Sequence, residues 1–160
     1  MKKQFTLKRG MVIVASALLI GTVFLSSCKK DNNSKTMYTV SGNANSSQVV
    51  PSVTDSGTAA ITGTYDASKN MLNYTISWSK LTGSPSGVGF YGGAASGANG
   101  TQVGNNVTIT TAGTTGSAVG TMTLTDSQES DLLAGKWYYL ITTPVNTHGE
   151  VRGQITTTAQ

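Results

Sequence analysis

The chain has 160 residues, with 11 Lys and Arg against seven Asp and Glu, and it carries one cysteine and one histidine. Four of the 11 cationic residues lie within the first nine positions, so the rest of the chain holds seven cationic and seven acidic side chains. This balance lacks the clustered basic face of a nucleic-acid-binding protein, and we expect no nucleic-acid partner. One cysteine forms no intramolecular disulfide, and the length suits a single domain.

The first 28 residues combine a cationic start, an apolar run over 11–25 and the sequence Leu25-Ser26-Ser27-Cys28. This order is typical of a secretory signal peptide, and the run is shorter than the roughly 20 residues that a membrane span needs. The last four residues resemble the lipobox of bacterial lipoproteins. The resemblance implies that residues 1–27 are a signal peptide cleaved before Cys28, and that Cys28 carries lipid, palmitate included. The alternative is an ordinary signal peptide with an incidental cysteine.

Residues 29–36, which follow that cysteine, contain no apolar side chain. Because such a segment buries no surface, we expect residues 28–36 to be a flexible tether. The lipobox implies anchoring to the cell envelope, with a membrane as partner. Lys29 and Lys30 stand where an aspartate would resemble the inner-membrane retention signal of enteric-type bacteria. This favours the outer membrane, with the domain periplasmic or surface-exposed.

Residues 37–160 are rich in Thr, Gly, Ser and Asn, a composition that favours strands and turns. We expect a first strand at 37–41 and an extended segment at 48–51, because Pro51 disfavours a helical conformation of the preceding residue. Residues 57–65 and 72–79 alternate apolar and polar side chains around a turn, which predicts a β-hairpin with one buried face.

Residues 82–105 contain eight glycines, and we expect a loop with little local structure there. A functional loop is the alternative. Two further strands are predicted at 107–110 and 118–124. Thr125 and Gln128 have the spacing of a capping box, so a short helix is expected at about 126–134.

The last two predicted strands are 137–142 and 149–157. Together these elements predict an all-β fold, an antiparallel sandwich or barrel of about seven or eight strands with one short helix. Immunoglobulin-like and superoxide-dismutase-like arrangements both fit this pattern.

The order of three segments resembles the chordin-type domain, or CHRD domain, over roughly residues 38–156. The segments are Gln48-Val49-Val50-Pro51, Gly97-Ala98-Asn99-Gly100 and the closing motif Gly149-Glu150-Val151-Arg152-Gly153-Gln154-Ile155. The closing motif is the most specific of the three. The resemblance implies a sandwich fold and a binding or structural module of the cell envelope rather than an enzyme.

That family often carries a His-x-His pair before the central glycines and a further histidine before the closing motif. Here these positions hold Gly89, Tyr91 and Thr142. The family has been likened to copper–zinc superoxide dismutase, in which such histidines bind metal. Since His148 is the only imidazole, we expect no metal site and no cofactor, and we interpret His148 as a solvated turn residue.

Within the closing motif, the strand alternation places Glu150, Arg152 and Gln154 on one face. We expect Arg152 to tie its strand to a loop through charge-assisted bonds, with Glu150 as one partner. The alternative is an anion or ligand site at these residues.

No nucleophile elbow, phosphate loop or paired-carboxylate site is present, so catalytic residues are not expected. Phe90, Tyr91 and the run Trp137-Tyr138-Tyr139 could form an aromatic ligand platform, although alternation sends about half of them to the core. The expected function is a non-catalytic module with an unknown protein or glycan ligand. The alternatives are a superoxide-dismutase-like redox protein and a carbohydrate- or protein-binding surface lipoprotein.

Overall fold

A computed structural model describes residues 36–160. The predicted signal peptide, Cys28 and the tether as far as residue 35 lie outside the described residues. Among the described residues, no helix is long and apolar enough to cross a membrane.

The described part contains ten strands, one 3₁₀ helix and one α-helix. The strands are β1 (Met37–Asn45), β2 (Thr58–Asp66), β3 (Met71–Ser79), β4 (Gly87–Gly92), β5 (Thr101–Val103), β6 (Ile109–Thr111), β7 (Gly116–Thr123), β8 (Tyr138–Thr142), β9 (Val151–Gln154) and β10 (Thr156–Ala159). The helices are η1 (Ser46–Gln48) and α1 (Asp126–Leu133).

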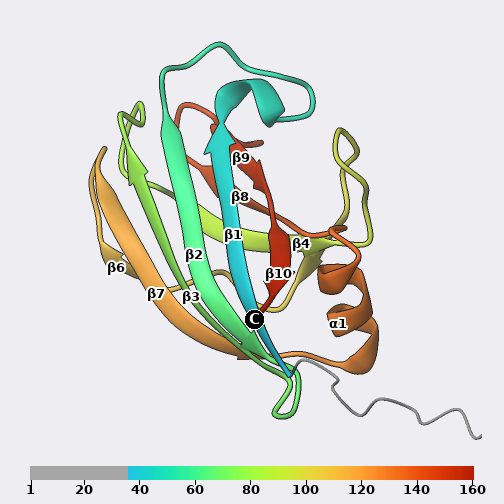
Figure 1. Cartoon of the computed structure of the whole chain (residues 1–160). Helices are drawn as coiled ribbons and strands as arrows, with labels where there is room; N and C mark the ends of the chain where they lie inside the picture. Colours follow the sequence, from blue (N-terminus) through green and yellow to red (C-terminus); the bar gives the residue numbers. More distant parts are fainter. Residues whose placement is uncertain (1–35) are drawn as a thin grey trace, which may run out of the picture. The chain divides into compact units, whose positions relative to one another are not determined.

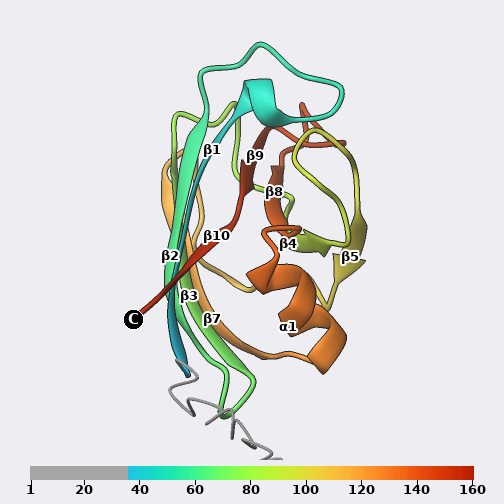
Figure 2. The same ribbon diagram turned by 45° about the vertical axis from the view of Figure 1, so that its right-hand side comes forward.

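All strand pairings are antiparallel, and the order is β5-β4-β8-β9-β1-β2-β3-β7-β6, with β10 paired to β1. The sheet curls on itself into a half-barrel (Figure 1). Strands β1, β2, β3 and β7 form one wall, and β4, β8 and β9 form the other (Figure 2). The predicted all-β, antiparallel fold with one short helix is confirmed, with ten strands in place of seven or eight.

The predicted hairpin is the β2–β3 pair, in which Thr58 faces Ser79 and Asp66 faces Met71. Its inward side chains enter the core from both strands. These are Ala59, Ile61 and Tyr65 on β2 and Leu72, Tyr74, Ile76 and Trp78 on β3. The period of two therefore predicted both the strands and the buried face correctly.

The expectation of a loop over 82–105 is wrong in its centre, where β4 pairs with both β5 and β8. Val88 and Phe90 alternate into the core and are fully buried, which gives the strand its apolar face. The glycines of β4 have close neighbours. A Cβ at Gly89 would lie 3.3 Å from the Tyr91 ring and one at Gly92 2.9 Å from the indole nitrogen of Trp137, so the high glycine content of this strand reflects packing.

Two further expectations need correction. Ser46–Gln48 form η1, because the Asn45 side chain accepts a hydrogen bond from the Gln48 backbone at 3.1 Å, and the extended conformation begins only at Val49. The predicted strand 149–157 is divided at Ile155 into β9 and β10, because β9 pairs with β8 while β10 pairs with β1.

Helix α1 begins at the predicted capping box. The Gln128 backbone donates to the Thr125 hydroxyl at 3.3 Å, and the Thr125 backbone donates to the Gln128 side chain at 2.9 Å. Leu132, on the inner face of the helix, is fully buried. The Gln154 amide donates to the Gly135 carbonyl at 2.7 Å, so the end of the helix is tied to β9.

Candidate functional site

Glu150 is fully buried, and both of its carboxylate oxygens accept hydrogen bonds. The Thr82 backbone and hydroxyl donate at 2.6 Å each, and the Thr143 hydroxyl donates at 2.7 Å. Burial by itself raises the pKa of Glu150, but the bonds from Thr82 and Thr143 outweigh it and hold the pKa below its ordinary value. The carboxylate therefore joins the start of the 82–86 loop to the end of β8.

Arg152 is 2% exposed and binds the loop that follows β4. Its guanidinium donates to the Ala98 carbonyl at 2.7 Å and to the Asn99 side chain at 3.3 Å. The expected bonds between strand and loop are present. Burial lowers the pKa of the Arg152 guanidinium.

The expected partnership between Arg152 and Glu150 is wrong. The two ion pairs among residues 36–160 are Lys69–Asp66 and Lys136–Asp131. Because β9 begins at Val151, the strand alternation does not set the direction of the Glu150 side chain, which turns to the threonines instead.

A row of stacked side chains crosses β4, β8 and β9. The rings of Tyr91 and Tyr138 are parallel to within 8° with centroids 5.1 Å apart, and the two residues face each other across β4 and β8. The guanidinium carbon of Arg152 lies 3.6 Å from the centroid of the Tyr138 ring. Such a cation–π contact is strongest where water is excluded, as it is here.

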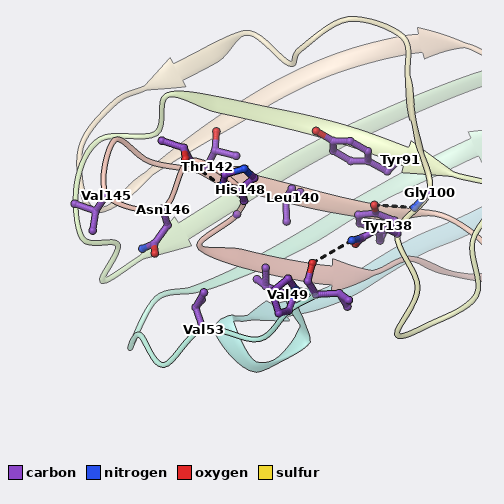
Figure 3. Close-up of a pocket in the computed structure, with 15 residues that line it drawn as sticks. Val49, Val53, Tyr91, Gly100, Tyr138, Leu140, Thr142, Val145, Asn146 and His148 are labelled. Atoms are coloured by element: carbon purple, nitrogen blue, oxygen red, sulfur yellow. Dashed lines mark hydrogen bonds between the residues drawn. The ribbon is translucent and has the colours of Figure 1, made fainter.

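A pocket of about 760 Å³ lies on the outer side of β8 (Figure 3). Its floor is formed by Tyr138, Leu140 and Thr142. One side is the segment 49–53, which we call the wall segment, and one end is the loop 143–149, which we call the rim loop. The remaining lining residues are Tyr91, Asn99 and Gly100.

The wall segment is fixed by the same loop that Arg152 holds. The Asn99 amide donates to the Val50 carbonyl at 3.0 Å while its oxygen accepts from Arg152. The Gly100 backbone donates to the Tyr138 hydroxyl at 3.1 Å. The buried arginine therefore positions the pocket wall through Asn99.

Gly149 and Gly153 of the closing motif are required by the backbone conformation and by close packing. Gly149 has φ of +129°, a conformation that favours glycine, and it ends the turn in which its N–H donates to the Asn146 carbonyl at 3.1 Å. A Cβ at Gly153 would lie 2.7 Å from the Tyr139 ring and 2.8 Å from the Asn43 carbonyl. β9 therefore approaches β1 as closely as glycine allows.

The three positions where family members carry histidine come together in space. Gly87 pairs with Thr142 and Gly89 with Leu140, so Gly89, Tyr91 and Thr142 share the outer face of β4 and β8. Tyr91 and Thr142 line the pocket. Residues 36–160 hold no group of three or more His, Cys, Asp or Glu side chains arranged to bind a metal ion.

His148 is exposed, as expected of a turn residue, and it also lines the pocket. Of the five aromatic residues considered as a platform, Phe90, Trp137 and Tyr139 are fully buried in the core. Tyr91 and Tyr138 face outward at the pocket. Sequence reasoning missed the pocket, because its wall segment precedes its floor by almost 90 residues.

Of three comparisons with known proteins, one gave a match, and it is to a protein-family model. The CHRD domain model matches residues 40–155. Searches of curated proteins and of solved structures each returned no significant match. Because the matched region covers more than half of the sequence and contains most of β1 and all of β2 to β9, the chain belongs to the CHRD domain family.

Proposed function

We propose that the protein is a lipid-anchored, non-catalytic binding module of the cell envelope and that the pocket beside β8 is its binding site. Membership in the CHRD family supports a binding or structural module. The observation that carries the binding role is a pocket whose wall is held in place by a buried arginine through Asn99. A built pocket of this size is typical of small-molecule sites.

The support for the lipid anchor comes from the N-terminal sequence. Cys28 is the only thiol of the chain, follows an apolar segment and completes a lipobox-like sequence. The domain begins at β1, whose first residue follows the predicted tether. The wall segment lies just beyond the last residue of β1, at the opposite end of the domain (Figure 1).

The redox alternative rests on histidine ligands that this chain replaces. Gly89 offers no side chain, and Tyr91 and Thr142 are not the imidazole ligands that copper and zinc prefer. Metal content after exposure of the purified protein to copper and zinc separates the two functions. We expect well under one equivalent, and a stoichiometric metal that resists dialysis would favour the redox protein.

The anchor is tested by replacing Cys28 with alanine and fractionating the cells. We expect wild-type protein in the membrane fraction, and we expect the Cys28→Ala protein either released or retained as the larger precursor. A variant that fractionates and migrates like wild type would show that Cys28 carries no lipid. Replacement of Ser27 by alanine keeps the thiol and serves as the matched control.

A further inference from the structure

The side chains that line the pocket restrict the chemical class of the ligand it can bind. This inference rests on the proposed binding role. We infer that the pocket binds an uncharged, mainly apolar small molecule that enters beside Val145 and His148. Apolar side chains make up the wall segment's share of the lining, and the floor and the rim loop add one each. They are Val49, Val50, Pro51, Val53, Leu140 and Val145.

Most polar side chains that line the pocket make at least one hydrogen bond within the protein. Asn99 binds Val50 and Arg152, and Thr142 donates to the Gly87 carbonyl at 3.3 Å. Asn146 donates to Asp55 at 2.9 Å.

Two further lining groups are paired in the same way. The Tyr138 hydroxyl accepts from the Gly100 backbone, and the Thr147 hydroxyl lies 3.3 Å from Nδ1 of His148. A sugar ring needs several hydrogen-bonding partners for its hydroxyl groups, because unpaired polar groups are costly to bury. This pocket would leave most of those hydroxyls unpaired.

Within the described residues, the Tyr91 hydroxyl and Nε2 of His148 make no hydrogen bond to another protein group. They can meet a polar end of the ligand, as can the Tyr138 O–H, which accepts from Gly100 and keeps its own proton, and the side-chain oxygen of Asn146. These few hydrogen-bonding groups suit a ligand that carries one hydroxyl or carbonyl group and is otherwise apolar.

The charged side chains next to the pocket are held by other protein groups. Arg152 lies buried behind Tyr138, Glu150 is enclosed by Thr82 and Thr143, and Asp55 accepts from Asn146. Among the lining residues there is no lysine, arginine or carboxylate. A carboxylate or phosphate ligand would lose its hydration without gaining an ion pair, so an uncharged ligand is favoured.

Val145 indicates where the ligand enters. It is 70% exposed at the rim loop, one of two large apolar side chains so exposed among the described residues, and the other is Val119 at 56% on the far sheet face. Covering Val145 with an apolar ligand removes this surface from water. Val119 provides a matched control outside the pocket.

The test uses the mature chain from residue 28 with Cys28→Ser, which needs no detergent and keeps the sheet, core and pocket of residues 36–160. Three probes are titrated and followed by amide NMR shifts, namely octan-1-ol, octanoate and maltose. We expect saturable shifts at Val49, Leu140 and His148 with octan-1-ol, and binding at least tenfold weaker for octanoate and maltose. Tighter binding of maltose or octanoate, or shifts located elsewhere, would overturn the inference.

Two variants locate the site. Val145→Asp is expected to weaken octan-1-ol binding about fivefold or more, whereas Val119→Asp leaves it unchanged. Both positions are exposed, so neither carboxylate disturbs the core. Equal effects of the two variants, or none at Val145, would contradict entry at the rim loop. The fate of the lipid anchor does not influence this measurement, so failure here is distinct from failure of the anchor.

Discussion

Arg152 connects three parts of the molecule through one side chain. It lies on β9, stacks on Tyr138 of β8 and donates to Ala98 and Asn99 of the glycine-rich loop. Hydrogen bonds to a charged group contribute about 1.5–3 kcal/mol each to stability. A guanidinium suits this place because it is planar, presents several donors and stacks on aromatic rings.

Replacing Arg152 by alanine should lower the free energy of unfolding by about 3 kcal/mol or more, because the stacking and both loop bonds are lost together. The melting temperature should fall by several degrees. Arg152→Lys should recover only part of the loss, because an ammonium does not reproduce the planar fork. Thermal melts of the three proteins measure both effects. An unchanged melt for Arg152→Ala would instead favour a ligand-binding role for this side chain.

Glu150 gives the stability a predictable dependence on pH. Its pKa is lowered in the folded protein, because the bonds from Thr82 and Thr143 outweigh the effect of burial. Its contribution is therefore complete above its ordinary pKa of 4.5 and is lost as the pH falls through the lower, folded value.

We expect the urea concentration at the unfolding midpoint of the wild type, measured between about pH 6 and pH 2, to decrease once the pH is lowered below 4.5. Glu150→Gln should be less stable at pH 7 and should show a shallower fall. A residual slope remains in both proteins, because bonds from Lys69 and Ser68 hold the pKa of Asp66 at about 2. Parallel curves for the two proteins would show that Glu150 does not set this dependence.

At the scale of the elements, β9 approaches β1 too closely for a side chain at Gly153. Gly153 leaves no room for a Cβ beside Tyr139, Asn43 and Ala44. Gly153→Ala should therefore lower stability by about 1–3 kcal/mol through overpacking. Gly83 is the matched control, because the nearest atom to a Cβ there belongs to Pro144 at 3.9 Å. Equal melting temperatures for the two alanine variants would contradict the packing account.

The elements that sequence patterns predicted are those whose signal is local. The alternation of Leu72 to Trp78 predicted β3, and the spacing of Thr125 and Gln128 predicted α1, because each depends on neighbours within a few residues. Strand β4 was not predicted, because its glycines are required by contacts with Trp137 and other residues that are distant in sequence. Glu150 was paired with the wrong partner, because the alternation rule does not hold outside β9.

The pocket was less predictable than the fold for the same reason. Sequence analysis singled out Gln48–Pro51, Asn99, Tyr91 and the closing motif separately. What joins them is the bond from Asn99 to Val50 and the pairing of Tyr91 with Tyr138, both set by the sheet topology. A period of two indicates the direction of a side chain and not its partner across the sheet.

At the scale of the whole domain, the wall segment of the pocket and the first residue of β1 lie at opposite ends of that strand (Figure 1). Nine strand residues separate them, which corresponds to about 30 Å at 3.3 Å per residue. The central claim is that this pocket is a binding site in the cell.

The most direct test places a photo-crosslinking amino acid at position 145 or at position 119 of the full chain in intact host cells. After irradiation, the mass of the purified protein reports what lay against each position. We expect a defined mass increase at position 145 that declines when octan-1-ol is added, and no such increase at position 119. Equal labelling of the two positions, or no labelling at position 145, would contradict the claim that the pocket binds a ligand.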